Sequence, residues 1–377
     1  MKIYQAKNVY EAALERIEYI YREFPNVAVS VSGGKDSTVV LFLCLEVARK
    51  LNRLPIHVYF LDQEAEWRQT VEYMRVLQDI PGVDLHWYQI QFDIFNSTSH
   101  VDDMLHCWRE GDTWMRRKEP TAITENNFGV NRFHDFLDIY LDKIYPGEPA
   151  CTMGGVRTDE SPNRAMALTT RPTYKHITYG KCLNSKDKHY VFYPIYDWEI
   201  ADVWHYIAAN NIPYNRVYDL MHQHGMHPRK MRVSCLTHEM SVIMLQDVQD
   251  ICRDTWNDVV MRLETANSVK HLKGGALHCP DELPPMFSSW VEYRDYLLEK
   301  LITDPAINEK MARKFRQCDA IFQGTRHMNG LYKEEITAII RNDHYFTRIS
   351  NFMSRQDKIA AHKRRKRKKR EGGGGSK

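Results

Sequence analysis

Hydrophobic and polar positions in the first part of the chain alternate between two periods. Short β-branched or aromatic runs, typical of buried parallel strands, occur at residues 27–31, 55–61, 85–90 and 149–153. Apolar residues at a helical spacing occupy residues 7–24, 37–51, 66–78 and 134–145. This alternation predicts an α/β fold with a doubly wound parallel sheet, in which ligands lie beyond the carboxyl ends of the strands.

From residue 237 onward the pattern changes to helical spacing without a strand signal. The predicted helices span residues 242–265, 289–302, 308–322 and 333–341. We therefore expect an α/β domain over residues 1–230 and a helical C-terminal domain over 231–358. Residues 359–377 form a basic tail that ends in Gly-Gly-Gly-Gly-Ser-Lys, which resembles an expression linker.

The first predicted strand runs directly into Ser-Gly-Gly-Lys-Asp-Ser at residues 32–37. Gly33 and Gly34 allow a sharp turn and let the backbone approach an anion without a Cβ in between. The N-terminus of the following helix offers free N–H groups and positive potential to a phosphate. Lys35 adds a point charge, and the serines add hydroxyl donors. A glycine-rich turn without a ligand is the alternative.

A second polar group follows the strand at residues 149–153. Its sequence is Gly-Gly-Val-Arg-Thr-Asp-Glu-Ser-Pro-Asn-Arg, residues 154–164. Arg157 and Arg164 could grip phosphate or carboxylate oxygens in a planar fork, and Glu160 could orient them or assist a metal. A surface cluster of ion pairs is the alternative.

Ser-Gly-Gly-Lys-Asp-Ser resembles the PP-loop of the N-type ATP pyrophosphatases, a superfamily that includes sulfate adenylyltransferase small subunits, with phosphoadenosine-phosphosulfate reductases as relatives. Gly-x-Arg-x-x-Glu-Ser-x-x-Arg at residues 155–164 is similar to the second motif of that branch. Residues 193–215 resemble its Pro-Ile-x-Asp-Trp … Pro-Tyr-Asn run, which we interpret as a strand, an Asp197 cap and an amphipathic helix. More narrowly, the chain resembles IbrA-type proteins, which tend to occur beside ParB-like partners.

The resemblance implies an adenine-nucleotide α-hydrolase-like fold that binds ATP and Mg²⁺, adenylates an acceptor and releases pyrophosphate. It implies catalytic roles for Lys35, Asp36, Arg157, Glu160 and Arg164. The nucleotide would be bound by Ser30, Ser32, Gly33, Gly34, Lys35, Asp36, Ser37, Asp62, Gly155 and Arg232. Asp36 and Asp62 would position Mg²⁺, with a plain helix cap as the alternative for Asp62. The chain lacks the Cys-Gly-Leu-His nucleophile of the true reductases, so we do not expect phosphosulfate reduction.

Charge is unevenly distributed. The 377 residues carry a net charge of +3, but without residues 363–377 there are 43 basic and 48 acidic residues, a net of −5. Eight consecutive basic residues at 363–370 suggest a nucleic-acid partner, with a solvated tail as the alternative. Two stretches, Cys107-Trp108-Arg109 and Trp114 to Lys118, combine tryptophans with basic residues. They could stack on a base and hold a phosphate, or form a solvated basic face with the tryptophans packed beneath it.

The remaining signals are weaker. Four histidines and Cys235 in residues 221–238 suggest a zinc site, but their spacing matches no standard structural zinc site. A basic phosphate-contacting loop with Arg229, Lys230 and Arg232 is favoured, with an ordinary surface segment as the alternative. The eight cysteines are scattered, so zinc or an iron–sulfur cluster is not favoured. No apolar run approaches the roughly 20 residues of a membrane span, and no signal peptide is apparent, so we expect a cytoplasmic protein.

Two other functions share the same loop. An ATP-binding regulatory subunit, acting with a ParB-like partner, would bind the nucleotide without turning it over. A nucleic-acid-modifying enzyme would use the same chemistry and hold its substrate through the tail and residues 114–118.

Overall fold

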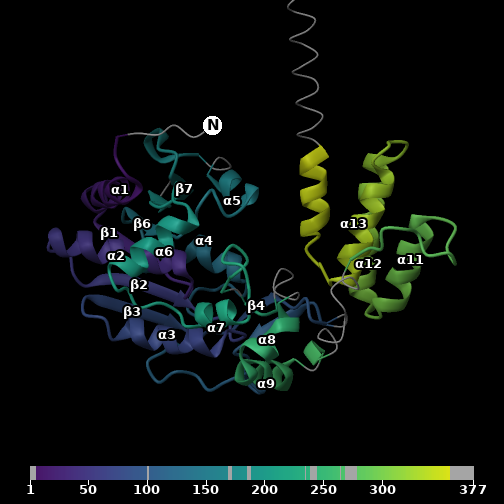
Figure 1. Ribbon diagram of the computed structural model, residues 1–377, viewed down its shortest axis with the longest axis horizontal. Coiled ribbons are helices and arrows are strands. Elements are labelled where there is room, and N and C mark those ends of the chain that lie inside the picture. The colour runs from purple at the N-terminus through teal and green to yellow at the C-terminus, as the bar shows by residue number, and fades with distance from the viewer. Residues whose placement is uncertain are drawn as a thin grey trace, which may run out of the picture. The chain divides into compact units, whose positions relative to one another are not determined.

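The computed structural model describes residues 6–99, 102–168, 172–184, 188–233, 235–237, 244–263, 265–267 and 278–356. Two compact units are present (Figure 1). The first comprises residues up to 94, 106–235 and 248–262, and the second comprises 95–105, 236–247 and the residues from 263 onward. The expected domains, divided at residue 230, stay a prediction because compactness alone does not establish independent folding. The basic residues 363–370 lie outside the described part.

The first unit alternates strands and helices along the chain. Its elements up to the fourth helix are α1 (Val9–Glu23), β1 (Asn26–Ser30), α2 (Lys35–Lys50), β2 (Ile56–Leu61), α3 (Arg68–Gln78), β3 (Val83–Tyr88), β4 (Phe92–Phe95), β5 (Met104–Cys107) and α4 (Phe133–Ile144). The elements that follow are β6 (Ala150–Met153), α5 (Pro162–Ala167), η1 (Tyr174–His176), β7 (Gly180–Asn184), β8 (His189–Phe192), α6 (Ile200–Ala209), α7 (Val217–Gln223), α8 (Leu245–Ile251) and α9 (Arg253–Arg262). Of these elements, β4, β5 and α8 each include residues assigned to both units.

The central sheet has the strand order β3-β2-β1-β6-β8-β7. All neighbouring strands are parallel except β7, which runs antiparallel to β8. The chain builds outward from β1 through β2 to β3, and later starts again on the other side of β1 with β6. The order therefore reverses between β1 and β6, and in such sheets this switch point is where ligands bind. The predicted doubly wound sheet is confirmed.

Alternate residues of each strand face opposite sides of the sheet. One side carries Val29, Phe60 and Met153, which pack in a common core with residues of α1, α2, α3 and α6. On the other side α4 lies over the sheet, and Tyr140 stacks on Tyr59 with ring centroids 4.0 Å apart. The near-continuous apolar strands follow from this cover on both faces.

Some elements differ from the sequence-based prediction. The strand expected at residue 193 ends at Phe192, and the next helix begins after Glu199 rather than at an Asp197 cap. Asp197 instead accepts two hydrogen bonds from Arg16, at 2.7 and 2.6 Å. β4, β5 and β7 were not predicted, and the helix expected over 242–265 is divided into α8 and α9.

The second unit contains α11 (Trp290–Leu301), α12 (Pro305–Phe322) and α13 (Met328–Ile340). From residue 244 onward the described residues form helices and connecting turns, as predicted. The three helices enclose a core that includes Met311, Phe315 and Leu331. The buried Arg294 donates to Asp319 and to Glu335, both at 2.8 Å, and links the three helices.

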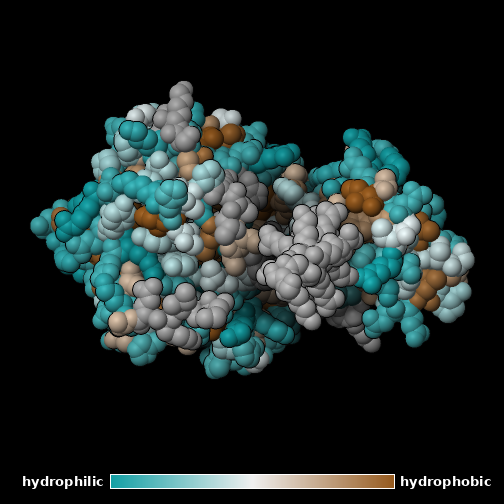
Figure 2. Space-filling view, turned by 90° about the horizontal axis from the view of Figure 1, so that it is seen from above, coloured by the Kyte–Doolittle hydropathy of each residue, from teal (hydrophilic) through white to brown (hydrophobic). Residues whose placement is uncertain are grey.

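The surface in Figure 2 is mostly hydrophilic, with scattered apolar residues. Single exposed apolar side chains such as Met286 and Ile321 are ordinary in a folded protein. Within the ranges that the structure describes, no helix combines the length and apolar character needed to cross a bilayer.

We predict that Glu335 makes the second unit less stable as pH rises. Burial raises the pKa of Glu335 to about 8 in spite of Arg294. An unfolded chain loses this proton near pH 4.5, so the associated stability is complete below that pH and is lost as pH rises through about 8. Glu335→Gln should weaken this pH dependence.

The measurement is hydrogen exchange of the α13 amides, compared between variant and wild type at each pH. The matched control is Glu299→Gln on α11, whose side chain is 72% exposed. An unchanged pH dependence in Glu335→Gln would contradict the prediction.

Candidate functional site

The loop between β1 and α2 turns at Gly33. Its φ of +72° is in the left-handed region, and an added Cβ would lie 2.7 Å from the Thr70 side chain. The Gly33 carbonyl accepts a hydrogen bond from Asn215 at 3.2 Å. The hydroxyl of Tyr218 accepts from the Lys35 backbone N–H at 3.1 Å. Asn215, from the run that sequence reasoning took as mainly structural, and Tyr218, which follows that run and lines the cavity, therefore hold the loop in place.

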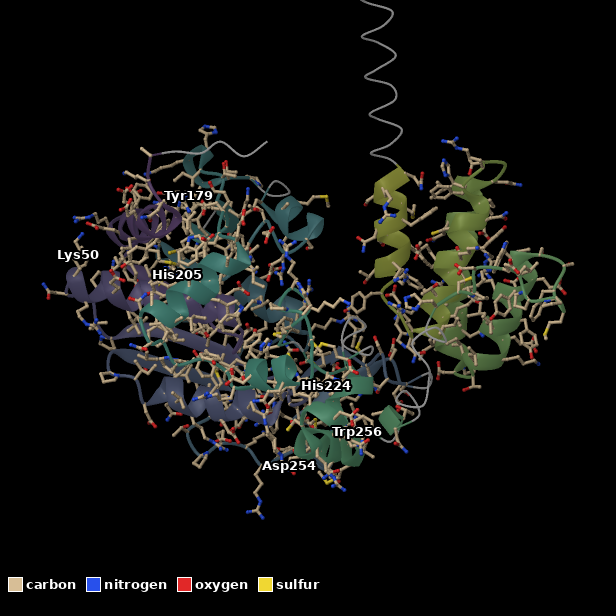
Figure 3. All side chains as sticks on the ribbon, in the orientation of Figure 1. Lys50, Tyr179, His205, His224, Asp254 and Trp256 are labelled. Carbon is tan, nitrogen blue, oxygen red and sulfur yellow. The ribbon has the colours of Figure 1, made fainter. Side chains whose placement is uncertain are left out.

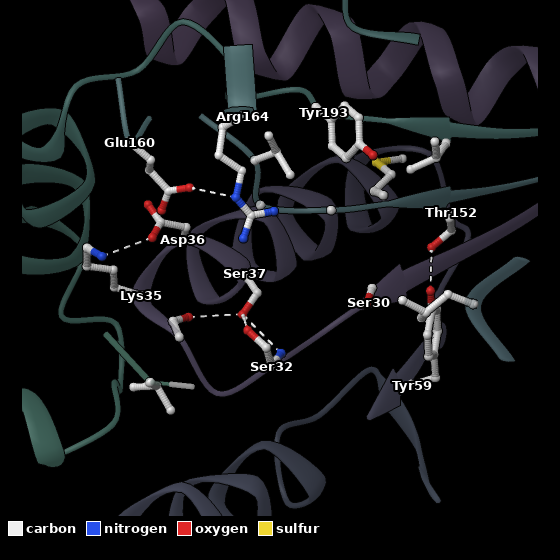
Figure 4. Close-up of a pocket in the computed structure, with 18 of the residues that line it drawn as sticks. Ser30, Ser32, Lys35, Asp36, Ser37, Tyr59, Thr152, Glu160, Arg164 and Tyr193 are labelled. Carbon is white, nitrogen blue, oxygen red and sulfur yellow. Dashed lines mark hydrogen bonds and ion pairs between the residues drawn. The ribbon is translucent and has the colours of Figure 1, made fainter. Parts of the chain in front are cut away.

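Two serines fix the curvature of the loop. The Ser37 hydroxyl donates to the Gly34 carbonyl at 3.0 Å and accepts from the Ser32 N–H at 3.2 Å. The Ser32 and Ser37 hydroxyls lie 3.3 Å apart, as Figure 4 shows at the start of α2. Because α2 begins at Lys35, the N-terminal end of a 16-residue helix follows directly from this turn.

Asp36 connects this loop to the segment after β6. One of its carboxylate oxygens lies 3.0 Å from Lys35 Nζ, and the other accepts from Arg157 Nε at 2.5 Å. The Arg157 side chain is only 3% exposed. Burial and the charge of Asp36 raise the pKa of Tyr218, which keeps its hydroxyl protonated next to Lys35. An ion pair of this kind, once buried, is costly to break by removing one partner.

The segment after β6 meets the loop closely. A Cβ on Gly155 would lie 2.6 Å from both the Asp36 carbonyl carbon and the Ser37 nitrogen, so only glycine fits there. Further on, Ser161 caps α5, and Arg164 lies 3.4 Å from Glu160. Figure 4 shows Glu160 and Arg164 near Asp36 and Lys35, on the side of the cavity away from Tyr59 and Thr152.

These segments line a cavity of about 570 Å³ beyond the carboxyl ends of β1, β6 and β8. It lies at the switch point of the sheet. The predicted residues that line it are Ser30, Ser32, Gly34, Lys35, Asp36, Ser37, Gly155, Glu160, Arg164 and Arg232. Gly33 and Arg157 lie behind this lining: Gly33 shapes the turn, and Arg157 holds Asp36. Arg157 is thus placed as a positioning residue.

Asp62 follows β2 as expected, but the structure corrects its placement. The Asp62 side chain is buried and accepts from Arg116 at 2.5 and 2.6 Å, from Trp87 at 2.8 Å and from Gln89 at 2.9 Å. It does not line the cavity. Arg116, which is far from Asp62 in the sequence, binds both oxygens of its carboxylate. No local sequence pattern predicts that contact.

Residues 114–118 are partly built into this same cluster. Arg116 lies over the Trp108 ring, 4.9 Å from its centroid, and Trp108 is 1% exposed. Lys118 lies over the half-buried Trp114, with Nζ 4.8 Å from the ring centroid. These contacts favour the alternative in which the tryptophans pack beneath a basic face. They do not leave an open aromatic surface on which a base could stack.

The histidine-rich segment is mostly exposed. His222, His224 (labelled in Figure 3) and His227 are exposed, and His238 lies outside the described residues. Arg232 reaches the cavity, while Arg229 and Lys230 do not line it. Within the described ranges, no group of three His, Cys, Asp or Glu side chains could hold a metal ion.

Mg²⁺ in nucleotide sites needs less than a complete protein cage. It is usually bound by one or two carboxylates together with phosphate oxygens. Of the two predicted ligands, only Asp36 lines the cavity, and Glu160 lies beside it. A Mg²⁺ ion here would find one protein carboxylate, Asp36, and would need phosphate oxygens and water for its other ligands.

Sequence reasoning missed Lys181, Tyr59, Thr152 and Tyr193, which also line the cavity. Lys181 comes from β7, and the Tyr59 hydroxyl lies 3.1 Å from the Thr152 hydroxyl. The position of Lys181 depends on the pairing of β7 with β8. No motif in the sequence marks it.

Comparison with known proteins gives a family match over residues 26–224, to the phosphoadenosine phosphosulfate reductase domain. The uncharacterized protein YbdN of Escherichia coli (strain K12) is 30% identical over 332 residues, 84% of this chain and 79% of YbdN. Adenosine 5'-phosphosulfate reductase 2 of Bacillus subtilis (strain 168) is 24% identical over 55% of this chain and 73% of its own length. Sulfate adenylyltransferase subunit 2 of Mycolicibacterium vanbaalenii is 25% identical, over 55% and 62%.

Among solved structures, the Candida glabrata FMN adenylyltransferase in complex with FMN and an ATP analogue is similar, with a TM-score of 0.35 and 13% identity. The match covers 58% of this chain and 64% of that one. The chain thus spans less than two thirds of this solved adenylyltransferase.

We predict that Gly155→Ala disrupts the site. The new Cβ meets backbone atoms of Asp36 and Ser37, which cannot move without shifting the N-terminus of α2. Overpacking of this kind typically costs about 1–3 kcal/mol of the free energy of unfolding. We expect ATP binding to be weakened as well.

Chemical denaturation and calorimetric titration with ATP test this prediction. Gly154→Ala is the matched control for the free energy of unfolding, because its Cβ would lie 3.4 Å from the nearest atom of the Tyr193 side chain, an acceptable contact. Gly154 lines the cavity, so the comparison of the two variants is made on unfolding alone. Equal effects of the two substitutions would contradict the steric argument.

Proposed function

The chain belongs to the phosphoadenosine phosphosulfate reductase domain family, and on that premise we propose that it binds MgATP, transfers the adenylyl group to an acceptor and releases pyrophosphate. The observation that carries the proposal is the meeting of two loops at one cavity. The phosphate-binding type of loop after β1 and the Arg- and Glu-bearing segment after β6 both line it.

In the proposed reaction, an acceptor oxygen attacks the α-phosphorus of ATP. A new phosphorus–oxygen bond forms, and the bond to the oxygen bridging the α- and β-phosphorus breaks. Pyrophosphate departs with the electron pair. The α2 N-terminus, the Ser32 and Ser37 hydroxyls and Lys35 would stabilise the charge on this leaving group. Mg²⁺ held by Asp36 would neutralise part of it.

The opposite side of the cavity would receive the acceptor. Arg164 is 56% exposed and Glu160 is 21% exposed, so this ion pair can rearrange when an anion enters. Arg232 is exposed at the mouth. Arg157 would act through Asp36 and does not need to touch the reacting atoms.

The positions and burial of the cysteines favour adenylyl transfer over thiol-dependent reduction as the reaction. Within the described residues no cysteine lines the cavity. The thiols of Cys44, Cys107, Cys151, Cys235, Cys252 and Cys318 are buried. Cys182, in β7 next to Lys181, is half-buried and does not line the cavity. Burial raises the pKa of the half-buried Cys279 to about 11, so little thiolate is present at neutral pH.

Product analysis tests the proposed reaction. Full-length protein incubated with MgATP and candidate acceptors should yield pyrophosphate with AMP or an adenylylated acceptor. Lys35→Ala should weaken ATP binding by about 1.5–3 kcal/mol if its contact is charge-assisted. Lys50→Ala, at the other end of the same helix and 67% exposed (Figure 3), is the matched control.

Formation of ADP and phosphate would refute the adenylyl-transfer proposal. Tight ATP binding without products, for every acceptor tried, would instead support a regulatory subunit that acts with a ParB-like partner. Unchanged ATP affinity in Lys35→Ala would contradict the proposal that this loop binds the nucleotide.

The basic residues 363–370 support a nucleic-acid partner on charge alone. We predict that truncation after His362 weakens binding to DNA and RNA. In the full chain, affinity for duplex DNA should fall with salt, with a log–log slope of about −0.9 per phosphate contacted. Because phosphate contacts carry no base information, the lost affinity should be independent of sequence. The same affinity and slope in both proteins would show that the tail does not bind nucleic acid.

A further inference from the structure

Lys181 is a buried cation in the wall of the candidate site. Its side chain lines the cavity, and the residue is only 1% exposed. Its Nζ atom has no hydrogen-bond partner among the residues that the structure describes. This contrasts with Lys35, Arg157 and Arg164, each of which lies beside Asp36 or Glu160.

The topology of the sheet explains how a lysine reaches this position. β7 runs antiparallel to β8, with Lys181 opposite Val191, and Val191 is opposite Thr152 in β6. Residues paired in register point to the same face of a sheet. Lys181, Val191 and Thr152 thus form a row on the face that α4 covers, and all three line the cavity.

The side chains around Lys181 do not satisfy the ammonium group. Val191 and Leu183 are apolar, and the Thr152 hydroxyl lies within hydrogen-bond distance of Tyr59. Asp138 of α4 is a carboxylate that lines the cavity on this face, but its residue is exposed and it forms no hydrogen bond with Lys181 Nζ. A buried charge without a partner is costly, and burial lowers the pKa of Lys181 accordingly. A position that served packing alone would be more stable with an apolar side chain.

We propose that Lys181 binds an oxyanion, forming a second anion subsite apart from the glycine loop. The chemical class is a phosphate, sulfate or carboxylate group, since each offers acceptor oxygens to an ammonium donor. β7 lies three strand positions from β1, roughly 14 Å at about 4.8 Å per strand. The subsite therefore suits a group other than the leaving pyrophosphate, and assigning it to the acceptor rests on the proposed function.

The test uses full-length Lys181→Met, which keeps the length of the side chain and removes its charge. The matched control is Lys188→Met, an exposed lysine at the turn of the same β7–β8 hairpin. Inorganic sulfate and phosphate, each with and without a non-hydrolysable ATP analogue, are titrated by calorimetry. Melting temperature is measured without ligand.

We expect Lys181→Met to melt at the same or a higher temperature than wild type, because an unpaired buried charge has been removed. We expect its affinity for the oxyanion to fall by about 10- to 100-fold, as for the loss of a charge-assisted hydrogen bond. Wild-type sulfate binding should weaken as pH rises, beginning below the usual lysine range because burial lowers the pKa of Lys181. Lys35 and Asp138 also line the cavity, so the same pH series on Lys181→Met isolates the contribution of Lys181. The Lys188→Met control should match wild type.

The two sources of the oxyanion give different results. Weaker sulfate or phosphate binding with unchanged affinity for the ATP analogue assigns the subsite to a separate acceptor. Weaker binding of the analogue itself assigns Lys181 to a phosphate of the nucleotide. Unchanged affinity for all three ligands, or a lower melting temperature with unchanged affinities, would overturn the proposal.

These measurements do not use turnover. If the wild-type protein binds sulfate through Lys181 but forms no adenylyl product, the subsite is supported and the proposed reaction is refuted. If adenylyl products form and Lys181→Met leaves every measured affinity unchanged, the proposed reaction is supported and the subsite is refuted.

Discussion

The candidate site depends on Asp36, which lies between two cations from different parts of the chain. Lys35 belongs to the same loop, whereas Arg157 comes from the segment after β6. Arg157 is buried, so the attraction acts where water screens it least. Gly155 places the second segment in direct contact with the backbone of the first. The cavity exists because these two loops, more than 100 residues apart, are held together at the switch point of the sheet.

Much of this arrangement could be predicted from the sequence because its signals are local. The β-branched runs at residues 27–31 and 149–153 predict parallel strands, and Gly33 and Gly34 followed by Lys35 predict an anion-binding turn. Strands of a parallel sheet end at one edge, so the two polar segments were expected to share it. The exact bounds shifted by a few residues, as they usually do when element ends are inferred from periodicity.

The errors concern contacts between distant residues. Asp62 was expected at the cavity, but Arg116, Trp87 and Gln89 engage its carboxylate inside the first unit. Asp197 was predicted to cap a helix, but in the structure its carboxylate is bound by both terminal nitrogens of Arg16. Lys181 was missed because its position depends on the register of an antiparallel edge strand. None of these partners lies within a few residues of its site, so periodicity and motif spacing cannot reveal them.

The external support of the glycine loop has a thermodynamic consequence. Asn215 holds the Gly33 carbonyl and Tyr218 holds the Lys35 N–H, while Ser32 and Ser37 brace the turn from within. A loop that is already in its binding shape loses little conformational entropy when a ligand arrives. More of the free energy of each phosphate contact would then contribute to affinity, because less of it offsets the entropy lost in ordering the chain. Asn215 of the Pro-Tyr-Asn run, which does not line the cavity, would therefore favour ligand binding by keeping the loop rigid.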